Sequence, residues 1–242
     1  MPSYHKLLHE GKAKIIFSGH NSISVIQHFK DVITAFNNTK KDIIPGKGII
    51  NNHISALLMS HLEQNDIKTH LIKMLNNREQ LVTKVAIIPL EVVIRNIAAG
   101  SFTKRFNLAE GKLLKSPIIE FYYKNDDLAD PIVNDDHIIH FQWVTINELK
   151  RIKSMSLQIN NILRKIFSDV NISLIDFKIE FGRLCDNNKH IILADEISPD
   201  TCRLWDMSTY QKLDKDCYRL NLGNIIETYT EVAKRLGVSI NI

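Results

Sequence analysis

The sequence predicts a protein of the α+β class, because strand-like and helix-like segments come in separate runs and do not alternate strictly. Short strand-like segments dominate the first third, and the longest amphipathic helices are expected in the remainder. Of the 242 residues, 44% are hydrophobic, which is enough for a substantial core. We expect two lobes, a small β-rich lobe over residues 1–88 and a larger α+β lobe over residues 89–242.

The expected small lobe combines short strands with one helix. A turn at residues 18–21 joins the first two strands as a hairpin, and residues 45–48 form a loop. Apolar residues recur at helical spacing from Ile49 to Leu62, which predicts a helix. The expected strands are Ala13–Phe17, Ser22–Phe29, Val32–Phe36, Ile67–Met74 and Gln80–Ile88.

The expected larger lobe contains two helices with clear boundaries. Thr145 and Glu148 form a capping box that begins a long amphipathic helix. The last helix is expected over residues 222–236, with Gly237 as its stop. Between these helices, two strands are expected over residues 174–181 and 190–197.

Composition excludes several classes of protein. The net charge of +4 is mild and the basic residues are scattered, so we expect no nucleic-acid partner. No apolar run approaches the roughly 18 residues that cross a bilayer, and no signal-peptide pattern is present. The sequence therefore predicts a cytoplasmic protein without a membrane contact. The three cysteines lack a C-x-x-C spacing, which argues against a disulfide framework or a zinc knuckle.

The segment from Asp176 to Phe181 alternates charged and aromatic or aliphatic residues. Because strand side chains alternate between faces, Asp176, Lys178 and Glu180 are expected on one face and the apolar residues on the other. Residues 186–189 have turn-forming chemistry, and a turn centred between residues 187 and 188 places Glu180 opposite Asp195.

Two opposed carboxylates repel each other unless a cation lies between them. Their oxygen ligands suit Mg²⁺ shared with a nucleotide phosphate. An alternative is an ordinary solvated charged face of a strand. The same register places Glu196 on the apolar side, and a slip of one residue would undo the pairing.

A second candidate site follows an apolar strand that ends at Arg95. Residues 102–106 are expected to be helical, with Ser101 as the N-cap. A helix start preceded by glycine presents free backbone N–H groups to an anion, and Arg95 adds a bidentate phosphate contact. A plain capped helix beside a surface arginine is the alternative.

A third candidate is the pair Lys12 and Lys14, which are expected on one face at the start of a strand, over nucleotide phosphates or along a basic hairpin edge. Neither a Walker A loop nor a dinucleotide fingerprint is present. Residues 124–131 are acidic and turn-forming, which predicts a loop.

Taken together, these segments resemble the phosphoribosylaminoimidazole-succinocarboxamide synthase (SAICAR synthetase) family in its short bacterial form. The resemblance spans nearly the whole chain, and its motifs occur in the family's order. They are Gly11–Lys14, Arg95–Ser101, Lys124–Asp126, Asp130–Pro131, Asp176–Gly182, Asp195–Asp200 and Arg203–Asp206.

The resemblance implies an ATP-dependent ligase of purine biosynthesis. Its substrates would be ATP, L-aspartate and carboxyaminoimidazole ribonucleotide (CAIR), with Mg²⁺ as the cofactor, and the chain would form a homo-oligomer. The implied fold is a small antiparallel β lobe over a larger α+β lobe, with ATP between them as in protein kinases and ATP-grasp enzymes. The runner-up is a small-molecule kinase on a related fold, and a nucleic-acid-binding module is a weaker alternative.

The resemblance also implies roles for single residues. ATP would contact Lys12, Lys14, Lys84, Val85, Ile88 and Lys124. CAIR and its phosphate would contact Arg95, Ser101 and Arg203, with Asp176 and Lys178 beside the imidazole as catalytic residues and Asp176 as a guess for the base. Mg²⁺ would be held by Glu180 and Asp195, with Asp130 as a weaker third ligand. Asn37 departs from an acidic residue that is frequent in the family, which puts the role of that position in doubt.

Overall fold

The computed structural model describes residues 6–35, 39–185 and 190–240. Asn37 and the expected turn at residues 186–189 therefore lie outside the described residues. The strands are β1 (Leu7–Glu10), β2 (Lys14–Ser18), β3 (Ser24–Phe29), β4 (Val32–Ala35), β5 (Lys40–Ile43), β6 (Leu71–Asn76), β7 (Glu79–Thr83), β8 (Val85–Ile97), β9 (Leu113–Tyr123), β10 (Ile132–Val133), β11 (Ile172–Leu184), β12 (Ile191–Ala194) and β13 (Cys202–Asp206). The helices are α1 (Lys47–Gln64), α2 (Ser101–Phe106), α3 (Asp135–His140), α4 (Ile146–Ser168), α5 (Asp216–Arg219), α6 (Ile225–Arg235) and the short 3₁₀ helix η1 (Asp126–Leu128).

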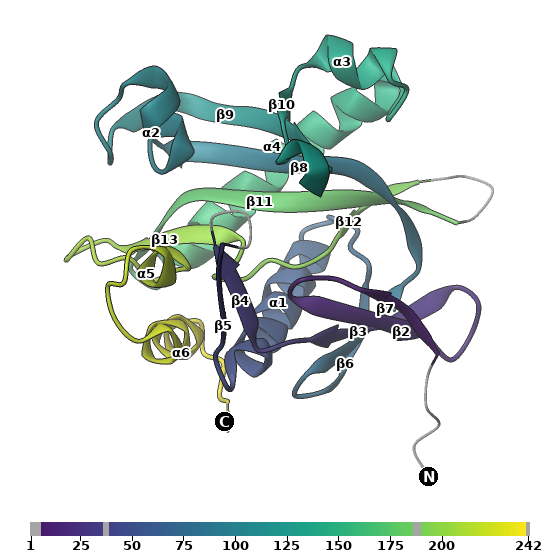
Figure 1. The fold of residues 1–242 in the computed structure, drawn as a ribbon, viewed down its shortest axis with the longest axis horizontal. Helices are drawn as coiled ribbons and strands as arrows, with labels where there is room; N and C mark the ends of the chain where they lie inside the picture. The colour runs from purple at the N-terminus through teal and green to yellow at the C-terminus, as the bar shows by residue number, and fades with distance from the viewer. Residues whose placement is uncertain (1–5, 36–38, 186–189, 241–242) are drawn as a thin grey trace.

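The strands form two main antiparallel sheets, as Figure 1 shows. The smaller sheet has the order β1-β2-β3-β7-β6, and the larger has the order β10-β9-β8-β11-β12, with β13 paired to β11. The α+β class predicted from the sequence is confirmed by this arrangement. Strands β4 and β5 form a separate hairpin.

The two sheets meet at a short parallel contact between residues 68–70 and β12. The backbone N–H of His70 donates to the carbonyl of Leu193 over 2.8 Å, and the N–H of Leu193 donates to the carbonyl of Lys68 over 3.0 Å. A second connection is the chain itself, which passes from β7 into β8 at Lys84. This junction fixes the small sheet beside β11 and β12 of the larger sheet.

The passage at Lys84 corrects one expected strand. The single strand expected over residues 80–88 is wrong, because β7 belongs to the small sheet and β8 to the large one. The division into lobes at residue 88 stays a prediction, since β8 continues unbroken through that position.

Local signals placed several elements correctly. The capping box of Thr145 and Glu148 begins α4, the hairpin of β2 and β3 is present, and α6 ends just before Gly237. Strand β9 was not predicted, because Pro117 and polar residues interrupt the strand pattern. Strand β13, which is short and nearly fully buried, was not predicted either.

One hydrophobic core joins the helices to the large sheet. Helix α1 lies beside α6, and α4 lies against β11. The apolar face of β11, with Phe177, Ile179 and Phe181, is buried in this core. The charged residues of β11 therefore lie on its opposite face, toward the small sheet. No helix of the described residues is both long and apolar enough to cross a membrane.

Candidate active site

Among the described residues, a large cavity lies between the two sheets, with a volume of about 1440 Å³. Pockets for one small molecule are typically about 300–1,000 Å³, so this cavity has room for more than one ligand. Its wall includes all the predicted site residues except Ile88 and Ser101. Residues from the two ends of the chain are thus brought to one place.

Ile88 and Ser101 differ from their expected positions. Ile88 is buried in the hydrophobic core, so its side chain is not part of the cavity wall. Ser101 is an exposed first residue of α2, and the predicted capping role of Ser101 is wrong. The N-cap is Gly100, which adopts a φ of 57° that serine would reach only with strain.

The charged face of β11 lies in the cavity, as the alternation predicted. Asp176, Lys178 and Glu180 all line the cavity, and the aromatic residues between them lie in the core. Asp176 is only 3% exposed and Glu180 only 6%. Buried carboxylates require partners, so the alternative of an ordinary solvated strand face is excluded.

The predicted register of the β11–β12 hairpin is wrong by one residue. Glu180 faces Ala194, not Asp195, and the carboxylate directly opposite Glu180 is Glu91 on β8. Asp195 follows the end of β12 with a left-handed φ of 65°. Its side chain nevertheless lies close enough that, after burial itself, its charge is the second factor that raises the pKa of Glu180. The two carboxylates are neighbours through a backbone kink rather than through strand pairing.

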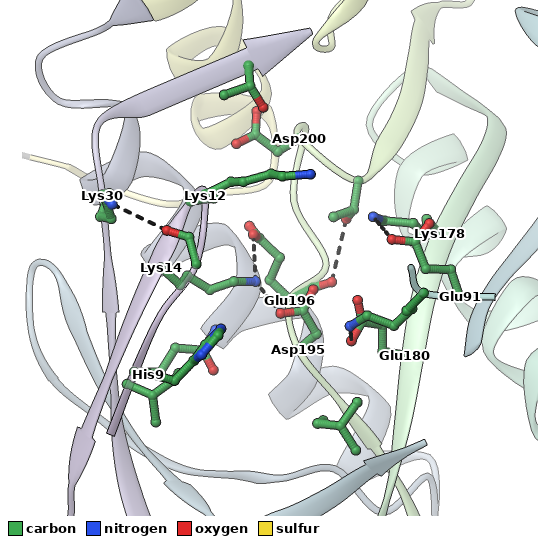
Figure 2. A pocket seen from close by; sticks show the side chains of 18 of the residues that line it. His9, Lys12, Lys14, Lys30, Glu91, Lys178, Glu180, Asp195, Glu196 and Asp200 are labelled. Carbon is green, nitrogen blue, oxygen red and sulfur yellow. Dashed lines mark hydrogen bonds and ion pairs between the residues drawn. The ribbon is translucent and has the colours of Figure 1, made fainter. Parts of the chain in front are cut away.

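Lysines from both sheets neutralise these carboxylates, as Figure 2 shows for Lys14, Lys178 and their partners. Lys14 of β2 donates to Asp195 and, over 2.8 Å, to Glu196. Lys124 donates to Glu180, and Lys178 donates to Glu91 over 2.5 Å. The contacts of Lys14 cross from the small sheet to the large-sheet side of the cavity.

Burial and these pairs shift the pKa values in opposite directions. Burial raises the pKa of Asp195, but the ammonium groups of Lys14, Lys178 and Lys124 together outweigh burial and hold that pKa at about 2. Burial lowers the pKa of Lys14, but Asp195 and Glu196 outweigh it and raise that pKa above its usual range. Burial raises the pKa of Glu180, and Asp195 adds to the rise. The site therefore stabilises the ionised form of Asp195 and disfavours the ionised form of Glu180.

The donor set of Glu180 and Asp195 fits a divalent cation. Within the described residues, Oε1 of Glu180 and Oδ2 of Asp195 accept no hydrogen bond, while their other oxygens bind lysines. Two hard oxygen ligands suit Mg²⁺, which keeps water and takes phosphate oxygens for its other positions. No group of three or more His, Cys, Asp or Glu side chains that could hold a metal occurs in the described ranges.

The other end of the cavity is a row of paired ions on three adjacent strands. Asp176 on β11 faces Arg95 on β8 and Arg203 on β13. It accepts from Nη1 of Arg95 over 2.6 Å and from Nη1 of Arg203 over 2.9 Å. Asp216 accepts from Nε of Arg203 over 2.8 Å, and Glu120 from Nε of Arg95 over 2.6 Å. Both arginines are thereby held rigidly at the cavity wall.

The remaining predicted residues lie nearer the rim. Lys12 donates to Asp126 over 2.8 Å, and both side chains are largely exposed. Asp130 lines the cavity, but its Oδ1 accepts the backbone N–H of Asn125 over 2.8 Å. Its role as a third metal ligand stays a prediction. Lys84 is exposed, and Val85 lies beside it at the start of β8.

Sequence reasoning missed several residues of the site. Glu196 and Asp200 stood within a quoted motif, yet only the structure shows that Glu196 binds Lys14 and that Asp200 binds the buried Lys47. Glu91 carried no local signal, because its position opposite Glu180 depends on the register of β8 against β11. Asp216 is likewise identified as a site residue only by its contact with Arg203.

Fold and site together define a protein with a large cavity between two sheets, lined by paired acidic and basic side chains. A family model described as SAICAR synthetase matches residues 7–236. A phosphoribosylaminoimidazole-succinocarboxamide synthase of Wolbachia pipientis subsp. Culex pipiens is 61% identical over 239 residues, which cover 99% of this chain and all of that protein.

Solved structures show the same likeness. The crystal structure of phosphoribosylaminoimidazole-succinocarboxamide synthase from Ehrlichia chaffeensis superposes with a TM-score of 0.96 at 62% identity and covers 98% of this chain and all of that one. A SAICAR synthetase in complex with ADP gives a TM-score of 0.93 at 43% identity, over 97% of this chain and 99% of that one. This chain belongs to the SAICAR synthetase family, whose members are ATP-dependent carbon–nitrogen ligases of purine biosynthesis.

Proposed function

We propose that this chain joins L-aspartate to CAIR, with cleavage of ATP to ADP and phosphate, in the cavity between its two sheets. The observation that carries the proposal is the set of lysine–carboxylate pairs that spans the cavity, with Lys14, Asp195, Lys124 and Glu180 at its centre. Such a set can exchange its internal partners for phosphate and metal. ADP bound to a relative that is 43% identical supports a nucleotide site.

ATP is assigned to the end of the cavity nearest the sheet junction. Lys12, Lys14 and Lys124 would contact its phosphates, and the edge from Lys84 to Ile88 would receive the adenine. Because the side chain of Ile88 is in the core, only its backbone can serve the base. Glu180 and Asp195 would hold Mg²⁺, which when bound offsets negative charge on the phosphates.

CAIR is assigned to the arginine end. Arg95 and Arg203 would contact its phosphate, and Lys178 would lie beside the imidazole carboxylate. Ser101 is not part of the cavity wall, so its contact with the phosphate stays a prediction. Asp176 is the residue predicted to be the base that deprotonates the amine. Both of its oxygens already accept from arginines, which supports a positioning role over proton transfer.

The chemistry follows from the leaving group. A carboxylate does not react with an amine because oxide would have to leave, so an oxygen of the CAIR carboxylate first attacks the γ-phosphorus and ADP leaves. The aspartate amine then attacks the acyl carbon, loses a proton, and phosphate leaves. The lysines offset charge on the transferring phosphoryl group, which is the main catalytic contribution a protein makes to such a step.

An omission assay tests this function. ADP release is measured with ATP, Mg²⁺, L-aspartate and CAIR, and each component is then left out in turn. We expect release to require all four. Release that needs no L-aspartate would instead indicate a small-molecule kinase.

The intermediate has its own test. Oxygen-18 placed in the CAIR carboxylate is expected in the released phosphate, because that oxygen leaves with phosphorus. Phosphate without the label would disprove the acyl-phosphate route. The homo-oligomer and the cytoplasmic location stay predictions.

A further inference from the structure

A group of three amide side chains lies where helix α1 packs against the small sheet. Gln27 of β3 and Gln80 of β7 are directly opposite each other in the register of the two strands. Directly opposed residues of an antiparallel pair project from the same face of the sheet, so these side chains are neighbours. Asn52 of α1 lies against Gln80, because Nε2 of Gln80 donates to the backbone carbonyl of Asn52 over 2.9 Å.

All three residues are almost completely removed from solvent. Gln27 is 2% exposed, and Gln80 and Asn52 are 0% exposed. Helix α1 contacts both β3 and β7, so helix and sheet enclose the amides together. Polar groups that are buried to this extent need hydrogen-bond partners, because they have given up their contacts with bulk water.

Each of the three amides keeps one buried atom that has no hydrogen-bond partner among the described residues. These atoms are Nε2 of Gln27, Oε1 of Gln80 and Oδ1 of Asn52. The amide nitrogens of Gln80 and Asn52 are already bound, to the backbone carbonyls of Asn52 and Asn76, each over 2.9 Å. Because a carbonyl only accepts, these bonds fix which end of each amide is the oxygen. The unpaired set is therefore one donor and two acceptors.

One water molecule matches this set of atoms. A buried water typically makes about three hydrogen bonds to polar groups that have no other partner. It can donate to the oxygens of Gln80 and Asn52 and accept from the amide of Gln27. We propose that Gln27, Gln80 and Asn52 bind a buried water molecule that links β3, β7 and α1. This assignment does not depend on the proposed function.

The water site adjoins the wall that the small sheet contributes to the cavity. Gln27 lines the cavity and is opposite Ile16 of β2, which also lines it. Lys14, whose ammonium binds Asp195, lies two residues before Ile16 on the same strand. A water that ties β3 to α1 therefore holds in place the strand that pairs with the one carrying Lys14.

A crystal structure that resolves ordered water tests the site directly. We expect one density peak at a hydrogen-bonding distance, about 2.7–3.2 Å, from Nε2 of Gln27, Oε1 of Gln80 and Oδ1 of Asn52. The three amides bonded directly to one another, with no peak between them, would overturn the proposal.

A salt comparison separates water from a monovalent cation, which would suit the site if the amide of Gln27 presented its oxygen instead. The melting temperature of the wild-type protein is measured in KCl and in choline chloride at equal ionic strength. A bound water predicts the same melting temperature within about 1 °C, because no K⁺ binding is linked to folding. A rise that is specific to K⁺ and is lost in Gln27→Leu would overturn the assignment of water.

The variant Gln27→Leu measures what the bound water contributes to stability. Its melting temperature should fall by about 3 °C, because the water loses its donor and the buried network is left incomplete. The matched control is Gln158→Leu on the exposed face of α4, which should stay within about 1 °C of wild type. An unchanged melting temperature for Gln27→Leu would contradict the proposal. The unbranched Gln27→Met replaces the leucine variant if that one does not fold.

Discussion

The two ends of the cavity hold their charges in different ways. At the junction end, Lys14 and Lys124 neutralise Asp195 and Glu180, and each of these carboxylates keeps one oxygen that is free of hydrogen bonds to the described residues. At the arginine end, both oxygens of Asp176 are occupied by arginines from the neighbouring strands. The first arrangement is open to ligands, and the second is closed.

The difference suits the junction end to catalysis and the arginine end to holding a substrate in position. Open pairs can exchange a lysine contact for a metal ion or a phosphate, which a nucleotide site requires. A closed row of buried ion pairs gives little room for exchange, but it fixes guanidinium groups in one orientation. The junction end is therefore expected to control turnover, and the arginine end to control stability and the affinity for CAIR.

The largest effect is expected for Glu180→Gln at the junction end. Loss of a metal ligand should lower the rate of ADP formation about 1,000-fold, since a bound cation supplies several kcal/mol of charge stabilisation. Because the fold raises the pKa of Glu180, its ionised form disfavours folding at pH 7, and the variant should melt no lower than wild type. Activity within tenfold of wild type, with the same Mg²⁺ dependence, would remove the metal assignment.

The next effect is expected for Asp176→Asn at the arginine end. The buried Arg95 and the half-buried Arg203 lose their shared counter-ion, so the free energy of unfolding should fall by about 3 kcal/mol, measured with urea. Turnover should fall more than ATP affinity. Asp135→Asn, which breaks an exposed pair with Lys153, should change stability by less than about 0.5 kcal/mol. Lost turnover at unchanged stability would favour Asp176 as the base.

A third effect concerns the pH dependence of the junction. Burial is the main factor that lowers the pKa of His70, to about 4, so the unfolded chain takes up this proton first as the pH falls. Neutral His70 therefore contributes fully to the stability of the fold above about pH 6.5, and this contribution is lost as the pH falls toward 4. The loss of unfolding free energy from pH 7 to pH 5 should be about 2 kcal/mol smaller in His70→Gln. The exposed His140→Gln should keep the full loss.

The smallest effect is expected for Gly100→Ala, which tests how tightly the arginine row is packed. The new Cβ would lie 2.4 Å from Nη2 of Arg203, and the φ of 57° adds strain. Gly237→Ala has a similar φ but nothing within 4 Å, so it measures the backbone cost alone, about 1 kcal/mol. Gly100→Ala should cost more than this control and should raise the KM for CAIR. Equal effects of the two variants would show that Arg203 is free to move.

Local sequence patterns were sufficient to predict the two faces of β11 and the start of α4. The alternation from Asp176 to Phe181 has a period of two, which depends only on the local backbone, and the structure confirms it. The capping box of Thr145 and Glu148 is equally local. The motifs that carried the resemblance also pointed to the residues that the fold gathers in one cavity.

Which charged residues contact each other depends on how the strands pack together. The partner of Glu180 across the strands is Glu91, and Asp195 comes close through a left-handed backbone conformation that strand counting could not predict. The Arg95–Asp176–Arg203 row needs three strands from distant parts of the chain in one register. Register is set by how whole strands pack against a shared core. A local sequence pattern therefore indicates which charged residues belong to the site, but it does not predict which of them form pairs.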